Sequence, residues 1–194
     1  MESQAGGTAG ESKPQCGGPW PVEGWDRYEF VEFLGAGGMG RIYKAYDRQL
    51  GRLVALKFLR GDDPESAARF LSEARAQARV EHEHVCKIHE VGEVQGKLYI
   101  AMQYIAGRTL EEAAPRMTLE QKLRLLRQVA EGVHAAHRLG LVHRDIKPAN
   151  VLVERGEDGA WRPYVTDFGL ARELEAPGLT RTGMVMGTPA YMAP

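Results

Sequence analysis

Cysteine is scarce in this 194-residue sequence, which contains only Cys16 and Cys86. Their spacing is typical neither of a metal site nor of a disulfide framework, because both need several ligands or cysteines at short intervals. Disulfide scaffolds belong mainly to oxidising compartments, whereas cytosolic proteins keep their thiols reduced. We therefore expect a cytoplasmic location.

Long apolar runs are also missing. No stretch approaches the roughly 20 apolar residues that a helix needs to cross a bilayer. The first four residues, Met-Glu-Ser-Gln, lack the basic-then-apolar order of a signal peptide. We expect no membrane contact from this chain, although a downstream segment of a longer form could anchor it.

Charge of one sign is not in excess, because 25 Lys and Arg residues accompany 26 Asp and Glu residues. Proteins that bind nucleic acid usually carry a basic stripe, and here the two signs are interleaved, so we expect no nucleic-acid partner. Hydrophobic residues make up 43% of the chain, enough at this length for a globular core.

Glycine and proline gather in residues 1–24, where few apolar side chains offset the entropy of ordering, and we expect a disordered tail there. From Trp25 onward, polar and apolar residues alternate or branched and aromatic residues concentrate, which indicates strands. Strands are expected at 28–34, 41–46, 52–59, 85–93 and 97–102. The pair Gln95-Gly96 indicates a tight hairpin turn between the last two.

One helix interrupts these strands. Asp63 is a suitable N-cap and Pro64 a suitable first helical residue. Apolar residues then recur at helical spacing on one face, at Ala67, Phe70, Leu71, Ala74 and Ala78. The pattern over 25–102 thus predicts a five-stranded antiparallel sheet with one helix.

The second part of the chain is mainly helical. After a short connection at 103–107, Thr118 and Gln121 have the spacing of a capping box. Helical periodicity continues to Leu139 and stops at Gly140. The apolar positions of this helix are Leu123, Leu126, Ala130, Val133 and His137. Two short strands at 151–153 and 164–166 follow, so the fold class is α+β.

Residues 143–150 read His-Arg-Asp-Ile-Lys-Pro-Ala-Asn, and Asp-Phe-Gly follows at 167–169. Phosphoryl transfer requires an acceptor for a hydroxyl proton, ligands for Mg²⁺, and cations near the moving phosphoryl group. Asp145, Asn150, Asp167 and Lys147 offer these groups. A single Asp or Asn in a loop is more often a turn former, but turn formation does not explain four such residues at these spacings.

These motifs resemble the catalytic loop and the metal-binding triplet of the protein kinase family, and the resemblance covers residues 28–194. It implies a two-lobed, protein-kinase-like fold. Residues 25–102 would form the N-lobe, 103–107 the hinge, and 108–194 an incomplete, mainly helical C-lobe. The implied cofactors are ATP and Mg²⁺.

The resemblance also implies roles for individual residues. Asp145 would be the base, Lys147 would steady the transferred phosphate, and Asn150 and Asp167 would hold Mg²⁺. Lys57, at the end of Val-Ala-Leu-Lys, would bind the α and β phosphates of ATP and pair with Glu73. Glu65, Glu81 and Glu83 are the competing partners for that lysine.

The segment Gly-Ala-Gly-Gly-Met-Gly at 35–40 lies between two predicted strands and resembles the kinase glycine-rich loop, whose backbone approaches phosphates closely. A hairpin that merely needs flexible glycines would have the same sequence. The resemblance implies that this loop binds ATP together with Lys57, the segment near Gln103 and several apolar residues, which could equally be ordinary core residues. The implied ATP-binding residues are Leu34, Gly35, Ala36, Gly37, Gly38, Met39, Gly40, Ile42, Ala55, Lys57, Met102, Gln103, Ile105 and Leu152.

Three further residues bear on the active state. Gln77 lies one turn after Glu73, where the family usually has an apolar residue, so either the helix packs loosely or Gln77 finds a backbone partner. His143 is expected to be a packing residue. Arg144 would, by analogy, form a basic pocket for a phosphate on the activation segment.

That segment contains the predicted phosphosites Thr180 and Thr182, whose phosphates would order it opposite Arg144. The alternative is that both are simply solvated threonines. Lys147 and Thr188 resemble the serine/threonine-specific branch of the family. The sequences of the motifs are similar to those of the bacterial members.

The leading hypothesis is transfer of the γ-phosphoryl group of ATP to serine or threonine hydroxyls of proteins, with self-association for autophosphorylation. The chain stops at Ala193-Pro194, one residue before the glutamate of the family's Ala-Pro-Glu motif, which suggests a fragment and an uncovered apolar face on the long helix. An ATP-binding or interaction module without turnover is therefore an alternative. A small-molecule kinase is another, although Lys147 and Asp-Phe-Gly count against it.

Overall fold

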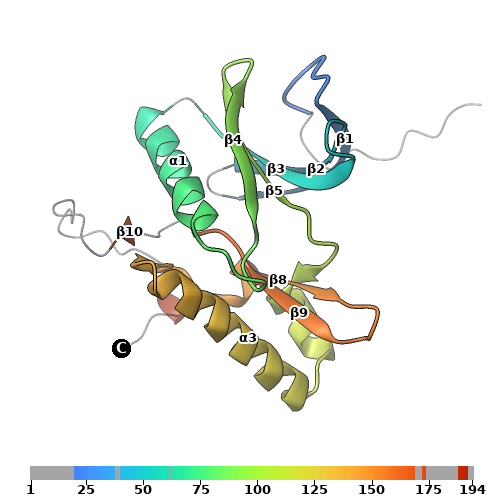
Figure 1. Cartoon of the computed structure of the whole chain (residues 1–194), viewed down its shortest axis with the longest axis vertical. Coiled ribbons are helices and arrows are strands. Elements are labelled where there is room, and N and C mark those ends of the chain that lie inside the picture. The colour runs from blue at the N-terminus through green and yellow to red at the C-terminus, as the bar shows by residue number, and fades with distance from the viewer. Residues whose placement is uncertain (1–19, 38–39, 62, 169–171, 174–187, 192–194) are drawn as a thin grey trace, which may run out of the picture.

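The computed structural model describes residues 20–37, 40–61, 63–168, 172–173 and 188–191. A five-stranded sheet with helix α1 beside it forms one half of the molecule, and helix α3 with a three-stranded sheet forms the other (Figure 1). This confirms the predicted α+β class and the arrangement of five antiparallel strands with one helix.

The strands of the large sheet are ordered β1-β2-β3-β5-β4, and every neighbouring pair is antiparallel. Their bounds are β1 Tyr28–Gly37, β2 Gly40–Asp47, β3 Arg52–Leu59, β4 Ile88–Val94 and β5 Lys97–Gln103. Gln95 and Gly96, both at positive φ, make the predicted turn between β4 and β5. Four of the five strands begin within a residue of the expected position.

Strand β4 begins three residues later than predicted, because the backbone of residues 84–86 pairs with the other half of the molecule. The Cys86 N–H donates to the Val165 carbonyl over 2.9 Å, and the Val165 N–H donates to the His84 carbonyl over 2.8 Å. Val85 and Cys86 are each only 1% exposed. This short segment therefore ties the two halves together.

Helix α1 spans Pro64–Ala78 and begins as the sequence indicated. The Asp63 carboxylate accepts a hydrogen bond from the Ser66 N–H over 2.8 Å. Phe70 and Ala74 are buried against Ile100 of the sheet. Ala78, expected on this face, is instead exposed, because the last turn buries Ala76 and Gln77.

Helix α3 spans Leu119–His137, and its capping box joins Thr118 and Gln121 in both directions. The residues that it buries are Leu125, Val129, Gly132 and Ala136, each one position before a residue that the periodicity selected. A methyl group on Gly132 would lie 3.0 Å from the His84 carbonyl oxygen, so this close contact sets the buried face. The expected uncovered apolar face is present at Leu119, Leu123 and Leu126, which are 73%, 59% and 53% exposed.

The remaining elements are short. Strands β6 (Arg108–Thr109), β8 (Val151–Arg155) and β9 (Trp161–Val165) form the three-stranded sheet in the order β6-β8-β9. The two-residue strands β6, β7 (Leu141–Val142) and β10 (Arg172–Glu173) were not predicted, since two residues carry no periodicity. The short helices are α2 Leu110–Ala113, η1 Ala114–Arg116, η2 Pro148–Asn150 and η3 Pro189–Tyr191. No helix in the described ranges has the length and apolarity to cross a membrane.

The expected disordered tail is too long by five residues, and its first 19 residues lie outside the described part of the chain. The Trp20 ring centroid lies 5.3 Å from those of Phe30 and Tyr43. Val22 is 1% exposed, and the Gln95 amide donates to the Glu23 carbonyl over 2.6 Å. The composition of residues 1–24, rich in glycine and proline, did not reveal that the apolar residues Trp20 and Val22 pack on the sheet.

We predict that Trp20→Ala lowers the free energy of unfolding by about 2 to 3 kcal/mol, because four aromatic rings lose a partner. Urea denaturation measures this change. Leu50→Ala, at a side chain 59% exposed, is the control and is expected to have almost no effect. Equal effects of the two substitutions would contradict the packing of residues 20–24 on the sheet.

Candidate active site

The β8–β9 hairpin positions two of the predicted metal ligands. Asn150 directly precedes β8 and Asp167 follows shortly after β9, and Val151 pairs with Val165 where the two strands meet. The Thr166 backbone and hydroxyl both donate to the Asn150 carbonyl, over 3.0 and 3.2 Å. Side chains 17 positions apart in the sequence are thereby held near each other.

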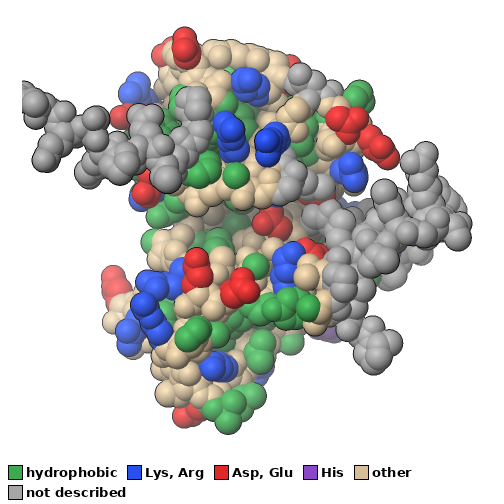
Figure 2. All heavy atoms as spheres, turned by 180° about the vertical axis from the view of Figure 1, so that it is seen from behind, with side chains coloured by type: hydrophobic (Ala, Val, Ile, Leu, Met, Phe, Trp, Pro, Cys, Tyr) green, Lys and Arg blue, Asp and Glu red, His purple; other side chains and the backbone are tan. Residues whose placement is uncertain are grey.

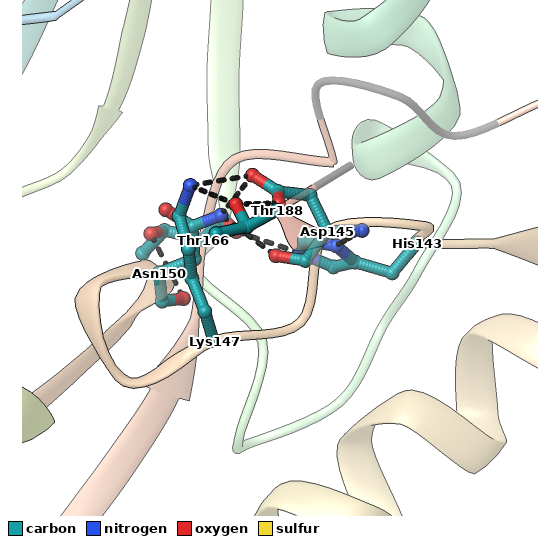
Figure 3. A network of polar contacts seen from close by, with 6 residues as sticks. All are labelled: His143, Asp145, Lys147, Asn150, Thr166 and Thr188. Atoms are coloured by element: carbon teal, nitrogen blue, oxygen red, sulfur yellow. Dashed lines mark hydrogen bonds and ion pairs between the residues drawn. The ribbon is translucent and has the colours of Figure 1, made fainter. Parts of the chain in front are cut away.

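Asp145 is the centre of a polar network, shown in Figure 3. Its Oδ2 lies 2.9 Å from Lys147 Nζ and accepts from Asn150 Nδ2 over 3.0 Å. Its Oδ1 accepts from the Thr188 hydroxyl over 2.6 Å, and Lys147 Nζ donates to that same hydroxyl over 2.9 Å. Two other residues of the predicted catalytic loop and one from far along the chain therefore converge on the Asp145 carboxylate.

These contacts keep the carboxylate ionised. Burial raises the pKa of Asp145, but hydrogen bonds from Thr188, Lys147 and Asn150 outweigh burial and hold that pKa below its ordinary value. An ionised carboxylate that already accepts a hydroxyl hydrogen bond has the geometry of a proton acceptor.

His143 supports the loop from beneath, as expected of a packing residue. It is 1% exposed, and its ring lies 4.6 Å from that of Phe168. Its Nδ1 accepts from the Asp145 N–H over 3.3 Å, and Nε2 therefore donates to the Thr166 carbonyl over 2.9 Å. Burial lowers the pKa of His143, which favours this neutral ring.

Lys57 lies in the middle of β3, and its ammonium contacts Asp167 Oδ1 at 2.5 Å. The ion pair between Lys57 and Glu73 that the resemblance implies is absent from this structure. One ammonium faces two carboxylates, and Asp167, at φ 53°, turns toward it. The cation and one metal-ligand candidate are thus joined directly.

Glu73 is left buried without a full set of partners. Its side chain lies on α1 with only 8% of the residue exposed, and its Oε1 has no hydrogen-bond partner. Burial raises the pKa of Glu73 to about 7, with Lys57 opposing the rise and Asp167 adding to it. A buried carboxyl group without a close cation favours its neutral form.

Gln77, one turn further along α1, has found a backbone partner. Its amide donates to the Cys86 carbonyl over 2.7 Å, and the residue is 6% exposed. Of the two outcomes left open by the sequence, this is the one observed. The bond anchors α1 to the segment that joins the two halves.

Several predicted ATP-binding residues lie in adjacent rows of the large sheet. Gly35 is opposite Ile42, and Ile42 is opposite Lys57. Ala55 is paired with Met102 in the neighbouring row. The sheet thus groups these five residues, while Leu152 lies on β8 in the other half.

The remaining predicted nucleotide contacts differ in exposure and in the partners of their backbone groups. Leu34 is 43% exposed, and Ala36 is exposed as well. Both backbone groups of Gln103 have partners inside the protein: its N–H donates to the Lys87 carbonyl, and its carbonyl accepts from the Cys86 thiol. Ile105, which follows β5, is buried, and its carbonyl accepts from the Gly107 N–H.

The glycines at 35–40 differ in whether packing requires them. A methyl group on Gly40 would lie 2.1 Å from the Phe58 carbonyl oxygen, so the sheet itself requires glycine there. A methyl group on Gly35 or Gly37 would meet nothing within 4 Å. Packing therefore does not explain Gly35 and Gly37. The space beside them is open, so a ligand can approach the backbone closely there. Gly38 and Met39 lie outside the described residues.

Thr180 and Thr182 also lie outside the described residues. Arg144 is exposed, and its backbone has a positive φ of 63°. The sequence indicated Thr188 only as a residue typical of the serine/threonine-specific branch, and not as a site residue. Sequence reasoning also missed Thr166, for which the only signal was its place directly before Asp167.

Comparison with known proteins shows the family of the chain. The protein kinase domain family matches residues 28–194. The chain belongs to the protein kinase family. Serine/threonine-protein kinase PknJ of Mycobacterium tuberculosis is 42% identical over 172 residues, which are 86% of this chain and 29% of PknJ. PknA of the same organism is 38% identical over 179 residues, which are 87% of this chain and 41% of PknA.

Among solved structures, the crystal structure of the M. tuberculosis PknI kinase domain matches with a TM-score of 0.62 and 33% identity. The match covers 74% of this chain and 59% of that one. The chain therefore spans only part of the relatives that it matches. The five-stranded sheet with α1 corresponds to a kinase N-lobe, and the described remainder to an incomplete C-lobe.

We predict that Glu73 makes stability depend on pH. Between its ordinary pKa of 4.5 and about 7, the unfolded chain has lost the Glu73 proton and the folded chain retains it. The free energy of unfolding should therefore fall as pH rises through this window, with a limiting slope of about 1.4 kcal/mol per pH unit from this group. Urea denaturation at several pH values measures it.

Glu73→Gln removes the ionisable group, so the stability of this variant relative to the parent should rise from pH 4.5 to about 7 and then level off. Glu65→Gln, at an exposed position in the first turn of α1, is the matched control. Parallel pH profiles for the parent and Glu73→Gln would contradict the buried neutral carboxyl group.

Proposed function

We propose that this chain is an ATP- and Mg²⁺-dependent protein kinase that transfers the γ-phosphoryl group to serine and threonine hydroxyls. The observation that carries the proposal is the hydroxyl of Thr188, held 2.6 Å from Asp145 Oδ1 and 2.9 Å from Lys147 Nζ. A base and a cation meet at one alcohol oxygen there. A substrate alcohol needs the same two neighbours.

In this proposal Asp145 accepts the proton of the substrate hydroxyl as its oxygen attacks the γ-phosphorus, and the bond from that phosphorus to the bridging oxygen breaks to release ADP. Lys147 lies on the side of the phosphoryl group and stabilises its negative charge. Thr188 orients both side chains, because its hydroxyl donates to one and accepts from the other. His143 fixes the loop through Asp145 N–H, so the carboxylate is preorganised.

Asn150 and Asp167 are the proposed Mg²⁺ ligands. The Asn150 amide nitrogen donates to Asp145 over 2.8 and 3.0 Å, so its amide oxygen is the atom available to a cation. A carboxylate and an amide oxygen are suitable for Mg²⁺, which usually takes only one or two protein ligands besides phosphate and water. When bound, the metal would neutralise charge on the phosphates of ATP.

Lys57 is the proposed ligand of the α and β phosphates, and the open space above Gly35 and Gly37 accommodates the phosphate chain. Phosphates near the ammonium of Lys57 compete with Asp167 for it. Glu73 lies behind and is the second carboxylate toward which Lys57 can turn. The proposal thus gives Lys57 two alternative partners to Asp167, namely the phosphates of ATP and Glu73.

The assignment to proteins as substrates rests on the relatives, which carry the name serine/threonine-protein kinase. Autophosphorylation at Thr180 or Thr182, with Arg144 as the partner of the phosphate, belongs to the same proposal, as do self-association and a location in the cytoplasm, where ATP is abundant. A second candidate is an ATP-binding module without turnover. The pairing of Lys57 with Asp167 in place of Glu73 favours it.

Asp145→Asn is predicted to lower the rate of phosphoryl transfer by about a hundredfold or more, because the amide cannot accept the proton. ADP release with a serine-containing peptide measures the rate. ATP affinity should be unchanged, since Asp145 contacts the loop and not the row containing Lys57. ATP binding without any turnover in the parent chain would favour the second candidate.

Thr188→Val is predicted to lower kcat about tenfold, through the loss of two hydrogen bonds that position Asp145 and Lys147. Thr188→Ser keeps the hydroxyl and should restore most of the rate. If Ser and Val substitutions were equally slow, the methyl group and not the hydroxyl would be responsible.

A further inference from the structure

A basic groove lies behind the hinge, away from the catalytic loop. Its main cavity has a volume of about 540 Å³. Arg108, Arg116 and Arg155 line it together with the rings of Tyr104 and Trp161. No Asp or Glu is among its lining residues. Figure 2 shows Lys and Arg side chains gathered near the left edge of the lower half.

The three guanidinium groups are available. In the described part of the chain, none of them forms an ion pair with a carboxylate. All three residues are exposed. Arg155 is also held in place, because its Nε donates to the Gly159 carbonyl over 3.3 Å and its guanidinium lies 5.9 Å from the Trp161 ring centroid.

One wall of the groove is closely packed. A methyl group on Gly107 would lie 2.1 Å from the Val153 carbonyl oxygen, so the hinge runs directly against β8. Val153 itself is fully buried. A preformed site loses less conformational entropy on binding than a mobile one.

The groove continues past Trp161 and Gln121, which it shares with a second cavity of about 430 Å³ beside α3. The one carboxylate there, Asp158, already accepts from the Ala160 N–H and lies 3.4 Å from Arg162. The two cavities together form an elongated groove with aromatic walls and excess positive charge.

We propose that this groove docks an acidic segment of the protein that the kinase phosphorylates. Carboxylates of the segment pair with Arg108, Arg116 and Arg155, and an apolar side chain packs against Trp161. The inference rests on the proposed function for the identity of the partner. Complementary charge and a flanking aromatic ring are what such a segment requires.

The groove and the active site share one strand. Arg155 ends β8, and Asn150 directly precedes it, so about 16 Å of extended strand separates them. A substrate that occupies both sites needs at least about five extended residues between its acidic segment and its phosphorylated hydroxyl. A nucleic acid fits less well, because acidic and basic residues are nearly equal in number and the chain has a net charge of -1.

The test is fluorescence anisotropy of a labelled ten-residue peptide of alternating Glu and Leu, with a Gln and Leu peptide as the neutral control. The parent chain should bind the acidic peptide and not the neutral one. Arg108→Glu combined with Arg116→Glu should weaken binding by at least about tenfold. Arg127→Glu, on α3 outside the groove and 81% exposed, should leave binding unchanged.

A second measurement joins the acidic segment to a serine peptide through a linker. The combined Arg108 and Arg116 substitutions should raise KM for this substrate about tenfold and leave kcat unchanged. A serine peptide without the segment tests the proposed function separately. Undiminished binding by the substituted chain, or binding of decathymidine that depends on the same arginines, would overturn the docking of an acidic protein segment.

Discussion

The pairing of the Val165 backbone is the constraint on which the rest of the structure depends. On one side this fully buried residue is opposite Val151, which holds the two ends of the β8–β9 hairpin together. On the other side its N–H and carbonyl bond to His84 and Cys86, which join the hairpin to the large sheet. One residue therefore positions Asn150 and Asp167 and also sets how the two halves meet.

Electrostatic balance at the junction follows from this arrangement. Lys57 pairs with Asp167 beside the hairpin and not with Glu73 on α1. The buried Glu73 carboxyl group therefore favours its neutral form, and its pKa is raised to about 7. Gln77 holds α1 to Cys86 through a neutral bond that does not depend on this choice. The position of the helix and the partner of the lysine are thus controlled separately.

Local patterns predicted most of the elements, because alternation, capping residues and turn pairs act within a few residues. Strand β3 and the caps of α1 and α3 were correct for that reason. Predictions that depended on distant contacts were less accurate. Val85 pairs with the other half instead of joining β4, Trp20 finds aromatic partners far along the chain, and His84 selects the buried face of α3. The roles implied for Asp145, Lys147 and Asn150 came from motif resemblance, whereas the contact of Thr188 with Asp145 joins residues 43 positions apart and needed the structure.

The measurement that tests the central claim most directly is mass spectrometry of the phosphorylated products after incubation with ATP and Mg²⁺. The account predicts phosphate esters on serine or threonine side chains of a protein, either this chain or an added substrate. Release of ADP with free phosphate only, or phosphate found only on a small molecule, would contradict it.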